Sequence, residues 1–319
     1  MPKIVVLDGH TMNPGDLSWE KMEALGELSV YTHTPPTLVG ERAKDAEIIL
    51  TNKVVLDQSK IRKLPNLKCI SVMATGFNVV DVGAAREHGV VVCNVRRYAT
   101  DSVAQHVFAL LLGFWSKISL HNKSVTERDW QKSPYWSYNL SPTTELAGKI
   151  IGIYGLGQIG RKVAQIALAF GMEVLSHHKH PLRDKMHGVA FTTFEEMLQR
   201  SDVITLHAPL TVENEGIINR TSLSKMKPTA ILINTGRGGL IVEQDLKDAL
   251  EDGRIAGAGL DVLSEEPPKD GNILIGVPNC IITPHNAWAT KESRARLLEE
   301  SVLNVEAFLA GRPRNEIGK

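Results

Sequence analysis

Short apolar runs alternate with amphipathic stretches along the first hundred residues. The runs are four to six residues long and rich in Val and Ile, which is typical of strands covered on both faces of a parallel sheet. Between the runs, apolar positions recur at helical spacing. The pattern predicts strands at 3–8, 28–31, 47–51, 68–73 and 90–93 and helices at 17–25 and 79–88, which together form a five-stranded flavodoxin-like layer.

A long helix and a second strand–helix series follow. The helix is predicted to begin at a Ser102-x-x-Gln105 capping box, and the polar, aromatic segment 125–146 after it is typical of a loop or arm. A last helix is expected to begin after Thr290. The second series predicts strands at 150–154, 173–177, 202–208, 230–235, 257–262 and 280–283, and helices at 158–170, 193–200, 242–251 and 290–311.

Composition and charge narrow the possible functions. The 319 residues are 43% hydrophobic and 23% charged, which fits two folded domains and excludes a disordered chain. With 36 basic and 36 acidic residues, the chain has no net basic field for nucleic acid. No apolar run reaches the ~18 residues that a membrane helix needs, and we expect no signal peptide. Three widely spaced cysteines form no zinc or disulfide pattern, so we expect no metal site and a cytoplasmic location.

A glycine motif of the form G-x-G-x-x-G directly follows the strand 150–154 and opens the helix 158–170. This is the context of a dinucleotide fingerprint. Gly155 allows a tight turn, Gly157 lets a pyrophosphate approach the backbone, and Gly160 lets helix and strand pack closely. Amides at the start of the helix bind the pyrophosphate. We therefore expect an NAD or NADP site here rather than a purely structural turn.

The tip of the next strand is basic where the fingerprint normally carries an acid. That acid, ~20 residues after the glycines, binds the ribose hydroxyls of the cofactor. Here the tip consists of His177, His178, Lys179 and His180, with Arg183 close behind. A basic cluster suits a ribose 2′-phosphate and so favours NADP, and a solvated polar turn is the alternative.

Three further strand ends carry residues suited to anion binding and proton transfer. Arg237 follows the strand 230–235, where a guanidinium can bind a carboxylate with two hydrogen bonds. Glu266 follows the strand that contains Asp261, and His285 follows the last strand. Singly, each has an ordinary explanation as a surface or loop residue. Together, downstream of a dinucleotide loop, they predict an active site in which a carboxylate stabilises the charged imidazole.

The ordered set of motifs resembles the D-isomer-specific 2-hydroxyacid dehydrogenases, most closely the glycerate dehydrogenase or hydroxypyruvate reductase branch. The resemblance covers essentially the whole chain. Besides the glycine loop, it rests on Ala74-Thr75-Gly76-Phe77-Asn78 with Asp81, Asp101-Ser102-Val103-Ala104-Gln105-His106, Glu145-Leu146-Ala147-Gly148-Lys149, Leu206-His207-Ala208-Pro209-Leu210-Thr211, Asn234-Thr235-Gly236-Arg237-Gly238, Gly259-Leu260-Asp261-Val262 and Thr283-Pro284-His285.

The resemblance implies an α/β fold with two Rossmann-like domains. A flavodoxin-like catalytic domain would comprise residues 1–100 plus 289–319, and a doubly wound dinucleotide-binding domain residues 101–288. It also implies hydride transfer between a nicotinamide and a small 2-keto or 2-hydroxy acid, with hydroxypyruvate or glyoxylate favoured. A two-fold homodimer is expected through the helix 101–120 and the arm 125–147.

The family's residue roles carry over to matching positions. Arg237 binds the substrate carboxylate and polarises the keto oxygen, His285 protonates that oxygen, and Glu266 orients His285 and keeps it protonated. Asp261 is expected to touch the nicotinamide carboxamide. Further substrate contacts would come from Ala74, Thr75, Gly76 and Trp288, and cofactor contacts from Gly155, Gly157, Gln158, Ile159, Gly160, His177, His178, Lys179, His207, Ala208, Pro209, Thr235, Gly236, Arg237, Asp261 and His285.

Several alternatives stay open on the sequence. A formate dehydrogenase-like enzyme needs no proton-donor pair, so Glu266 beside His285 argues against it. A dinucleotide-sensing regulatory protein resembling the C-terminal binding proteins would share the fold and the three polar residues, and the absence of long tails argues against it. His106 is expected to be a packed helix residue, and His207 either shapes the nicotinamide pocket or packs. The aromatic side chains of 130–138 either anchor a loop or reach a second subunit.

Overall fold

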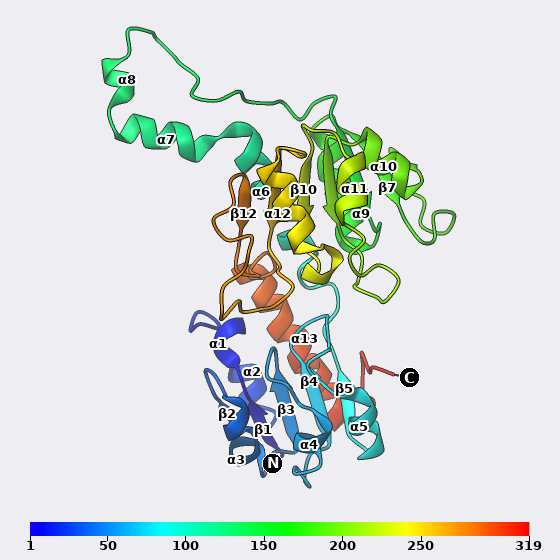
Figure 1. The fold of residues 1–319 in the computed structure, drawn as a ribbon. Coiled ribbons are helices and arrows are strands. Elements are labelled where there is room, and N and C mark those ends of the chain that lie inside the picture. The colour runs from blue at the N-terminus through cyan, green and yellow to red at the C-terminus, as the bar shows by residue number, and fades with distance from the viewer. Residues whose placement is uncertain (319) are drawn as a thin grey trace. The chain divides into compact units, whose positions relative to one another are not determined.

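The computed structural model describes residues 1–318 and contains two units, each with its own sheet (Figure 1). Unit 1 comprises residues 1–99 and 289–318, and unit 2 comprises residues 100–288. The chain therefore passes from one unit to the other twice, at residues 99–100 and again at 288–289. The sheets confirm the expected α/β class, and each unit is described by itself below.

Unit 1 is built on a parallel five-stranded sheet in the order β2-β1-β3-β4-β5, which is the flavodoxin-like order. Every residue of β3 and β4 is buried, as expected for apolar strands covered on both faces. The strands are β1 Lys3–Val6, β2 Glu27–Val30, β3 Ile48–Thr51, β4 Cys69–Val72 and β5 Val91–Cys93. The helices are α1 Gly9–Met12, α2 Glu20–Glu23, α3 Val39–Ala43, α4 Gln58–Ile61, α5 Val82–Glu87 and α13 Lys291–Leu309, with a short 3₁₀ turn at Pro36–Leu38.

Unit 2 has a parallel seven-stranded sheet in the order β12-β11-β10-β9-β6-β7-β8. The strand order reverses between β6 and β9, and ligands of such doubly wound sheets bind at the carboxyl ends near this point. The strands are β6 Ile150–Tyr154, β7 Glu173–His177, β8 Val189–Phe191, β9 Val203–Leu206, β10 Ile231–Asn234, β11 Gly257–Leu260 and β12 Cys280–Ile282. The helices are α6 Thr100–Ser116, α9 Gln158–Ala169, α10 Phe194–Arg200, α11 Arg220–Lys225 and α12 Glu243–Glu251, with a 3₁₀ turn at Gly238–Leu240.

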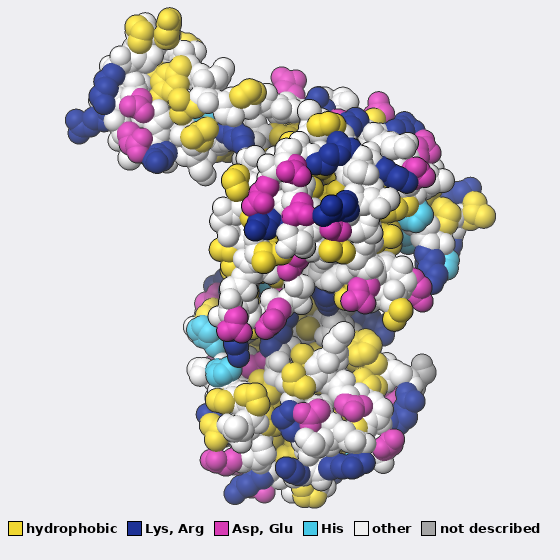
Figure 2. Space-filling view, in the orientation of Figure 1, with side chains coloured by type: hydrophobic (Ala, Val, Ile, Leu, Met, Phe, Trp, Pro, Cys, Tyr) yellow, Lys and Arg dark blue, Asp and Glu magenta, His cyan; other side chains and the backbone are white. Residues whose placement is uncertain are grey.

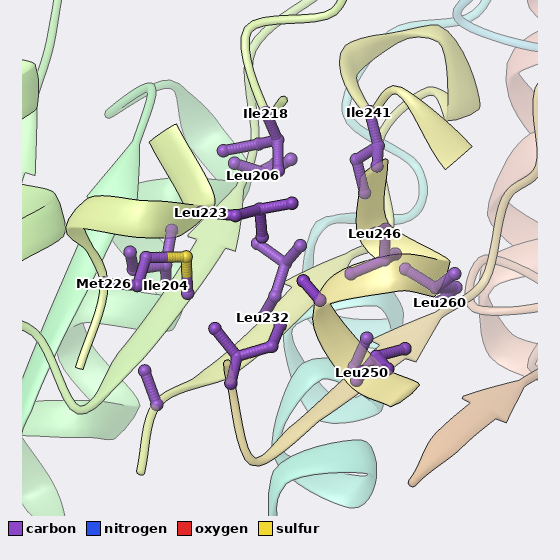
Figure 3. Packing of buried hydrophobic residues seen from close by; sticks show 14 of the residues in the cluster. Ile204, Leu206, Ile218, Leu223, Met226, Leu232, Ile241, Leu246, Leu250 and Leu260 are labelled. Carbon is purple, nitrogen blue, oxygen red and sulfur yellow. The ribbon is translucent and has the colours of Figure 1, made fainter. Parts of the chain in front are cut away.

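Two apolar cores hold the sheet of unit 2, one on each side of its central strands. On one side, α6 packs against β11, whose sequence Gly-Ala-Gly leaves room for it: a Cβ on Gly257 would lie 2.8 Å from a ring carbon of Phe114. The other core joins strands β9, β10 and β11 to α11 and α12 (Figure 3). It contains Ile204, Leu206, Leu223, Leu232, Leu246, Leu250 and Leu260, among others. These cores fix the strand ends that carry the polar residues.

Residues 118–147, called the arm below, extend from the sheet of unit 2 (Figure 1). The sequence predicted a loop or arm over 125–146, and the structure adds two helices, α7 Ile118–Thr126 and α8 Asp129–Lys132. The arm is held by internal hydrogen bonds, among them Trp130 Nε1 donating to the carbonyl of Trp136 at 2.9 Å. No single helix among residues 1–318 has the length and apolar content of a membrane span; α6 and α7 reach them only jointly, across a 56° bend.

The predicted capping box at Ser102 is wrong. Helix α6 begins at Thr100, so Ser102 lies inside its first turn. The Ser102 hydroxyl instead donates to the carbonyl of Ala287 at 2.5 Å. By contrast, Thr193 and Thr290 each accept a hydrogen bond from the amide three residues on, as N-caps of α10 and α13.

Candidate active site

The glycine loop leaves an open cradle at the start of α9. The first amides of a helix have no partner within it, and those of Gly157, Gln158 and Ile159 donate to no group in residues 1–318. A Cβ on Gly157 would meet nothing within 4 Å, whereas one on Gly160 would lie 2.2 Å from the carbonyl oxygen of Gly155. Gly160 therefore serves close packing, and Gly157 faces open space. Free amides beside an open backbone fit the pyrophosphate of a dinucleotide.

Two of the four residues at the basic tip of β7, His177 and His178, are held by contacts within the protein. The His177 ring stacks on Tyr154, with centroids 5.7 Å apart, and its Nδ1 lies 3.3 Å from the carbonyl of Thr192. His178 is held by Leu156 on one side and by Asp184 on the other. Only Lys179 and His180 of the four tip residues project into solvent.

His207 and Thr235 lie at the neighbouring carboxyl ends of β9 and β10. Burial lowers the pKa of His207 to about 3, so its ring is neutral at ordinary pH, and its Nε2 lies 2.8 Å from the Thr205 hydroxyl. The Thr235 hydroxyl is buried and has no hydrogen-bond partner within the described residues. An unsatisfied buried hydroxyl at this sheet edge supports a bound ligand there. Ala208 and Pro209 continue the chain from His207 along the same edge, and Gly236 follows Thr235.

The loop that carries Arg237 packs against the loop that carries Glu266. A Cβ on Gly238 would lie 1.9 Å from the carbonyl carbon of Leu263, so only glycine permits this approach. The amide of Leu263 in turn donates to Glu266 Oε1 at 2.9 Å. The exposed guanidinium of Arg237 donates to the carbonyl of Gly236 at 2.7 Å and has no carboxylate partner in the part of the chain that the structure describes. It is therefore available for an anionic ligand.

Glu266 and His285 form a close pair beside this loop. Nδ1 of His285 lies 2.5 Å from Oε2 of Glu266, and the two side chains are 26% and 29% exposed. Because the carboxylate can only accept, Nδ1 carries a proton and Nε2 is left to face a ligand. His285 adopts φ of +50°, a conformation that non-glycine residues rarely take without support from their surroundings.

The support for His285 comes from Asp261. This carboxylate is 1% exposed, and its two oxygens accept hydrogen bonds from the amides of Asn286 and Ala287, each at 2.9 Å. The Thr283 hydroxyl also donates to it, at 2.6 Å. The resemblance implies that Asp261 touches the nicotinamide; in the structure its oxygens accept from the two amides that directly follow His285.

Helix α6 contributes two residues that the sequence analysis did not place at the site. Ser102 binds the carbonyl of Ala287, as described above, and His106 Nε2 lies 2.9 Å from the Thr283 hydroxyl. Since that hydroxyl already donates its proton to Asp261, His106 is the donor. Ser102 and His106 are four residues apart and thus share one helix face, which was the available signal. The segment 283–287 is therefore fixed at three points.

The remaining predicted substrate residues are a loop of unit 1 and one tryptophan of unit 2. Ala74, Thr75 and Gly76 follow β4 in unit 1, where the Asn94 side chain donates to the carbonyl of Thr75 at 2.7 Å. Their three amides donate to no acceptor among residues 1–318, as an anion-binding loop requires. Trp288, the last residue of unit 2, is 8% exposed.

Residues 108–287 match the model of the D-isomer specific 2-hydroxyacid dehydrogenase NAD binding domain, which is more than half of the chain. The chain belongs to this family. It is 48% identical to the hydroxypyruvate reductase of Blautia hydrogenotrophica over 99% of this chain and all of that protein. It is 43% identical to the glycerate dehydrogenase of Methylorubrum extorquens, over 99% of this chain and 98% of that one. The family predicted from the motifs is confirmed.

Solved structures agree with this assignment. The acyclic imino acid reductase Bsp5 in complex with NADPH and D-Arg aligns with a TM-score of 0.86 at 33% identity, over 99% of this chain and all of that one. D-lactate dehydrogenase from Aquifex aeolicus, complexed with NAD and lactic acid, aligns with a TM-score of 0.82 at 30% identity, over 97% and 96% of the two chains. The protein is thus an NAD(P)-linked oxidoreductase of the 2-hydroxyacid dehydrogenase family, and nothing supports the regulatory alternative.

Proposed function

We propose that this enzyme reduces hydroxypyruvate or glyoxylate to the corresponding 2-hydroxy acid. The observation that carries the proposal is the His285–Glu266 pair, 2.5 Å apart, beside a guanidinium with no carboxylate partner in residues 1–318. A small 2-keto acid presents both a carboxylate and a carbonyl oxygen, which these groups suit. The names of the relatives from Blautia hydrogenotrophica and Methylorubrum extorquens favour hydroxypyruvate.

The geometry supports the following roles, which are part of the proposal. The reduced nicotinamide supplies the hydride. Arg237 binds the substrate carboxylate and polarises the keto oxygen. Glu266 accepts a hydrogen bond from Nδ1–H of His285 and stabilises the imidazolium, so Nε2 donates its proton to the developing alkoxide. In the oxidative direction Nε2 takes that proton back. The unpaired amides of 74–76 would bind the carboxylate from unit 1, which we propose as the catalytic domain, with unit 2 as the dinucleotide domain.

We propose that the enzyme uses NADPH in preference to NADH. Lys179 and Arg183 supply fixed positive charge after β7, and His180 supplies a further donor there. The glycine-loop cradle and the Thr235 hydroxyl suit either dinucleotide equally, so the preference depends on this tip alone. We also propose a cytoplasmic location, which the wide spacing of the three cysteines favours.

We further propose a homodimer through the arm and α6. The arm exposes large apolar side chains, including Ile118 at 68%, Tyr135 at 71% and Trp136 at 90%. Figure 2 shows hydrophobic atoms gathered on it. Internal hydrogen bonds order the arm, for example between the Ser124 and Tyr138 hydroxyls at 2.8 Å. An ordered, exposed apolar surface is typical of a subunit interface.

A purified-protein screen tests the reaction. Initial rates are measured for hydroxypyruvate, glyoxylate, pyruvate and 2-ketoisocaproate with NADPH and with NADH at neutral pH. We expect the highest kcat/KM with hydroxypyruvate or glyoxylate. A higher kcat/KM for a branched keto acid would contradict the proposed substrate, and failure to oxidise either cofactor with any keto acid would contradict the proposed function.

A further inference from the structure

A carboxylate lies inside the basic cluster that follows β7. Asp184 Oδ2 accepts from Arg183 Nη2 at 2.6 Å and from His178 Nε2 at 2.7 Å. Arg161, one turn into α9, donates to the main-chain carbonyl of Asp184 at 2.7 Å and has a guanidinium nitrogen 3.7 Å from its Oδ1. Figure 2 shows histidine and basic side chains together over this loop. Its donors therefore already have an anion among them.

Both ring nitrogens of His178 already have hydrogen-bond partners, so neither is available to another ligand. The amide of Leu156, in the glycine loop, donates to His178 Nδ1 at 3.1 Å. An amide can only donate, so Nδ1 is unprotonated and the ring proton sits on Nε2, which donates to Asp184. A second proton on Nδ1 would face the Leu156 amide. His178 thus joins the glycine loop to Asp184 through its two ring nitrogens.

The charge on Asp184 is permanent at working pH. Hydrogen bonds from Arg183 and then from His178 hold the pKa of this carboxyl well below its usual range. Its side chain is 20% exposed, against 69% for Arg183. A fixed negative charge at this place repels another anion and already uses donors that such an anion would need.

We propose that Asp184 is a specificity-determining residue that competes with the ribose 2′-phosphate of NADP for the basic groups after β7. The inference rests on the proposed cofactor site and deepens it. The carboxylate of Asp184 takes the place of a phosphate oxygen in the present hydrogen-bond set. A bound 2′-phosphate must share Arg183 with it or displace it. The preference for NADPH is therefore smaller than the basic residues alone would give, and NADH remains a usable cofactor.

Binding of nucleotide fragments tests this without turnover. Calorimetry measures the Kd of adenosine 2′,5′-bisphosphate and of adenosine 5′-monophosphate for the wild type and for Asp184→Asn. Asparagine keeps the shape and an acceptor oxygen but removes the charge. We expect the bisphosphate to bind about tenfold more tightly to the variant (~1.4 kcal/mol) and the monophosphate to change less than twofold. The ratio of kcat/KM for NADPH over NADH should rise in parallel.

Asp248→Asn is the matched control, because Asp248 on α12 is also paired with an arginine, Arg220, at 2.8 Å. It removes the same charge from unit 2 and should leave both dissociation constants unchanged. Arg183→Gln supplies a second test, since it should weaken the bisphosphate at least fivefold and leave the monophosphate alone.

The outcomes separate the inference from the function on which it rests. An unchanged bisphosphate affinity in a folded Asp184→Asn, with the monophosphate still bound, would overturn the role of Asp184 alone. An equal tightening in Asp248→Asn would show a general charge effect and overturn it as well. If the wild type binds neither fragment, the dinucleotide site itself is refuted.

Discussion

The carboxylate of Asp261 accepts a hydrogen bond from the amide of Ala287 at 2.9 Å, two residues beyond His285. Its other oxygen accepts from the amide of Asn286 at the same distance. These bonds hold the backbone in which His285 takes its positive φ, so the direction of the imidazole depends on a residue that directly follows β11. We therefore expect Asp261 to position the proposed proton donor, His285.

Asp261→Asn should therefore lower turnover more than it weakens substrate binding. The new amide group presents N–H where an amide now donates, so one of the two bonds is replaced by a repulsive contact. A loss of ~10-fold or more in kcat, with KM changed less than threefold, is expected in steady-state kinetics. Asp202→Asn is the control, because Asp202 also accepts from an amide, that of Ile150, at 2.9 Å. Equal losses in both variants would refute the positioning role.

Changes at the His285–Glu266 pair should affect proton transfer. His285→Ala is expected to lower kcat by ~10²-fold, the usual contribution of a positioned acid–base group. In Glu266→Gln a neutral amide replaces the carboxylate that stabilises the imidazolium. The limb of the pH–rate profile on which reduction slows with rising pH should therefore move to lower pH. The pH–rate profile with saturating keto acid measures this shift. A profile identical to that of the wild type would remove Glu266 from the mechanism.

Alanine substitutions at two glycines three residues apart should affect different properties, cofactor affinity at Gly157 and stability at Gly160. Gly157→Ala adds a Cβ into open space at an ordinary φ of −73°, so the melting temperature should stay within a few degrees. Its affinity for NADH should fall at least tenfold, because the methyl fills the cradle. Gly160→Ala places a Cβ against the Gly155 carbonyl and should destabilise unit 2 by ~1–3 kcal/mol. Thermal melting with fluorescence titration distinguishes them, and unimpaired NADH binding by Gly157→Ala would contradict the cradle.

The arm should control assembly. Replacing Ile118 and Trp136 with lysine removes apolar surface that the described chain itself leaves exposed, so the fold should persist while the dimer dissociates at micromolar concentration. Sedimentation velocity measures this. Val212→Lys, at a site that is 91% exposed outside the arm, is the control and should not change the sedimentation coefficient. A wild type that sediments as a monomer would contradict the proposed dimer.

The lowered pKa of half-buried His207 predicts that acid destabilises the fold. An unfolded histidine binds a proton near pH 6.5, whereas folded His207 does so only near its pKa of about 3. The unfolded state thus holds more protons between these values, and stability falls as pH drops through this range. Between pH 7 and pH 5, the free energy of unfolding should fall by ~2 kcal/mol more in the wild type than in His207→Gln. Urea unfolding at the two pH values measures this difference. An equal fall in the free energy of unfolding of the two proteins would contradict a lowered pKa of His207 in the folded state.

Much of the fold was predictable because its strands are apolar and its helices periodic. Strands β6 and β7 begin and end where the pattern placed them. The misses have local causes. The helix predicted at 17–25 shrinks to Glu20–Glu23, since the Asn13 side chain accepts from the amides of Gly15 and Leu17 and holds that segment as a turn. Strand β8 has three residues, and α11 is largely polar, so neither shows a period.

The site was predictable where chemistry and strand ends coincide, as at Arg237 and His285. The residues that hold those groups were not, because their partners are distant in sequence. Ser102 meets Ala287 across 185 positions, and His106 meets Thr283 across 177. Asp184 follows the basic tip closely, but nothing in the sequence shows that its loop folds back onto His178. A residue count therefore overstated the positive charge available to a 2′-phosphate.

Unit 1 consists of two stretches of chain, one synthesised before unit 2 and one after it. Its five strands are made before unit 2, yet α13, which buries Leu297, Val302 and Val305, is made only after all of unit 2. Unit 2 is continuous in sequence and can fold while the chain is still growing. The nascent strands of unit 1 therefore keep the apolar surface that α13 covers exposed while more than half of the chain is synthesised. Chaperone demand should therefore arise in the first hundred residues and end when α13 emerges.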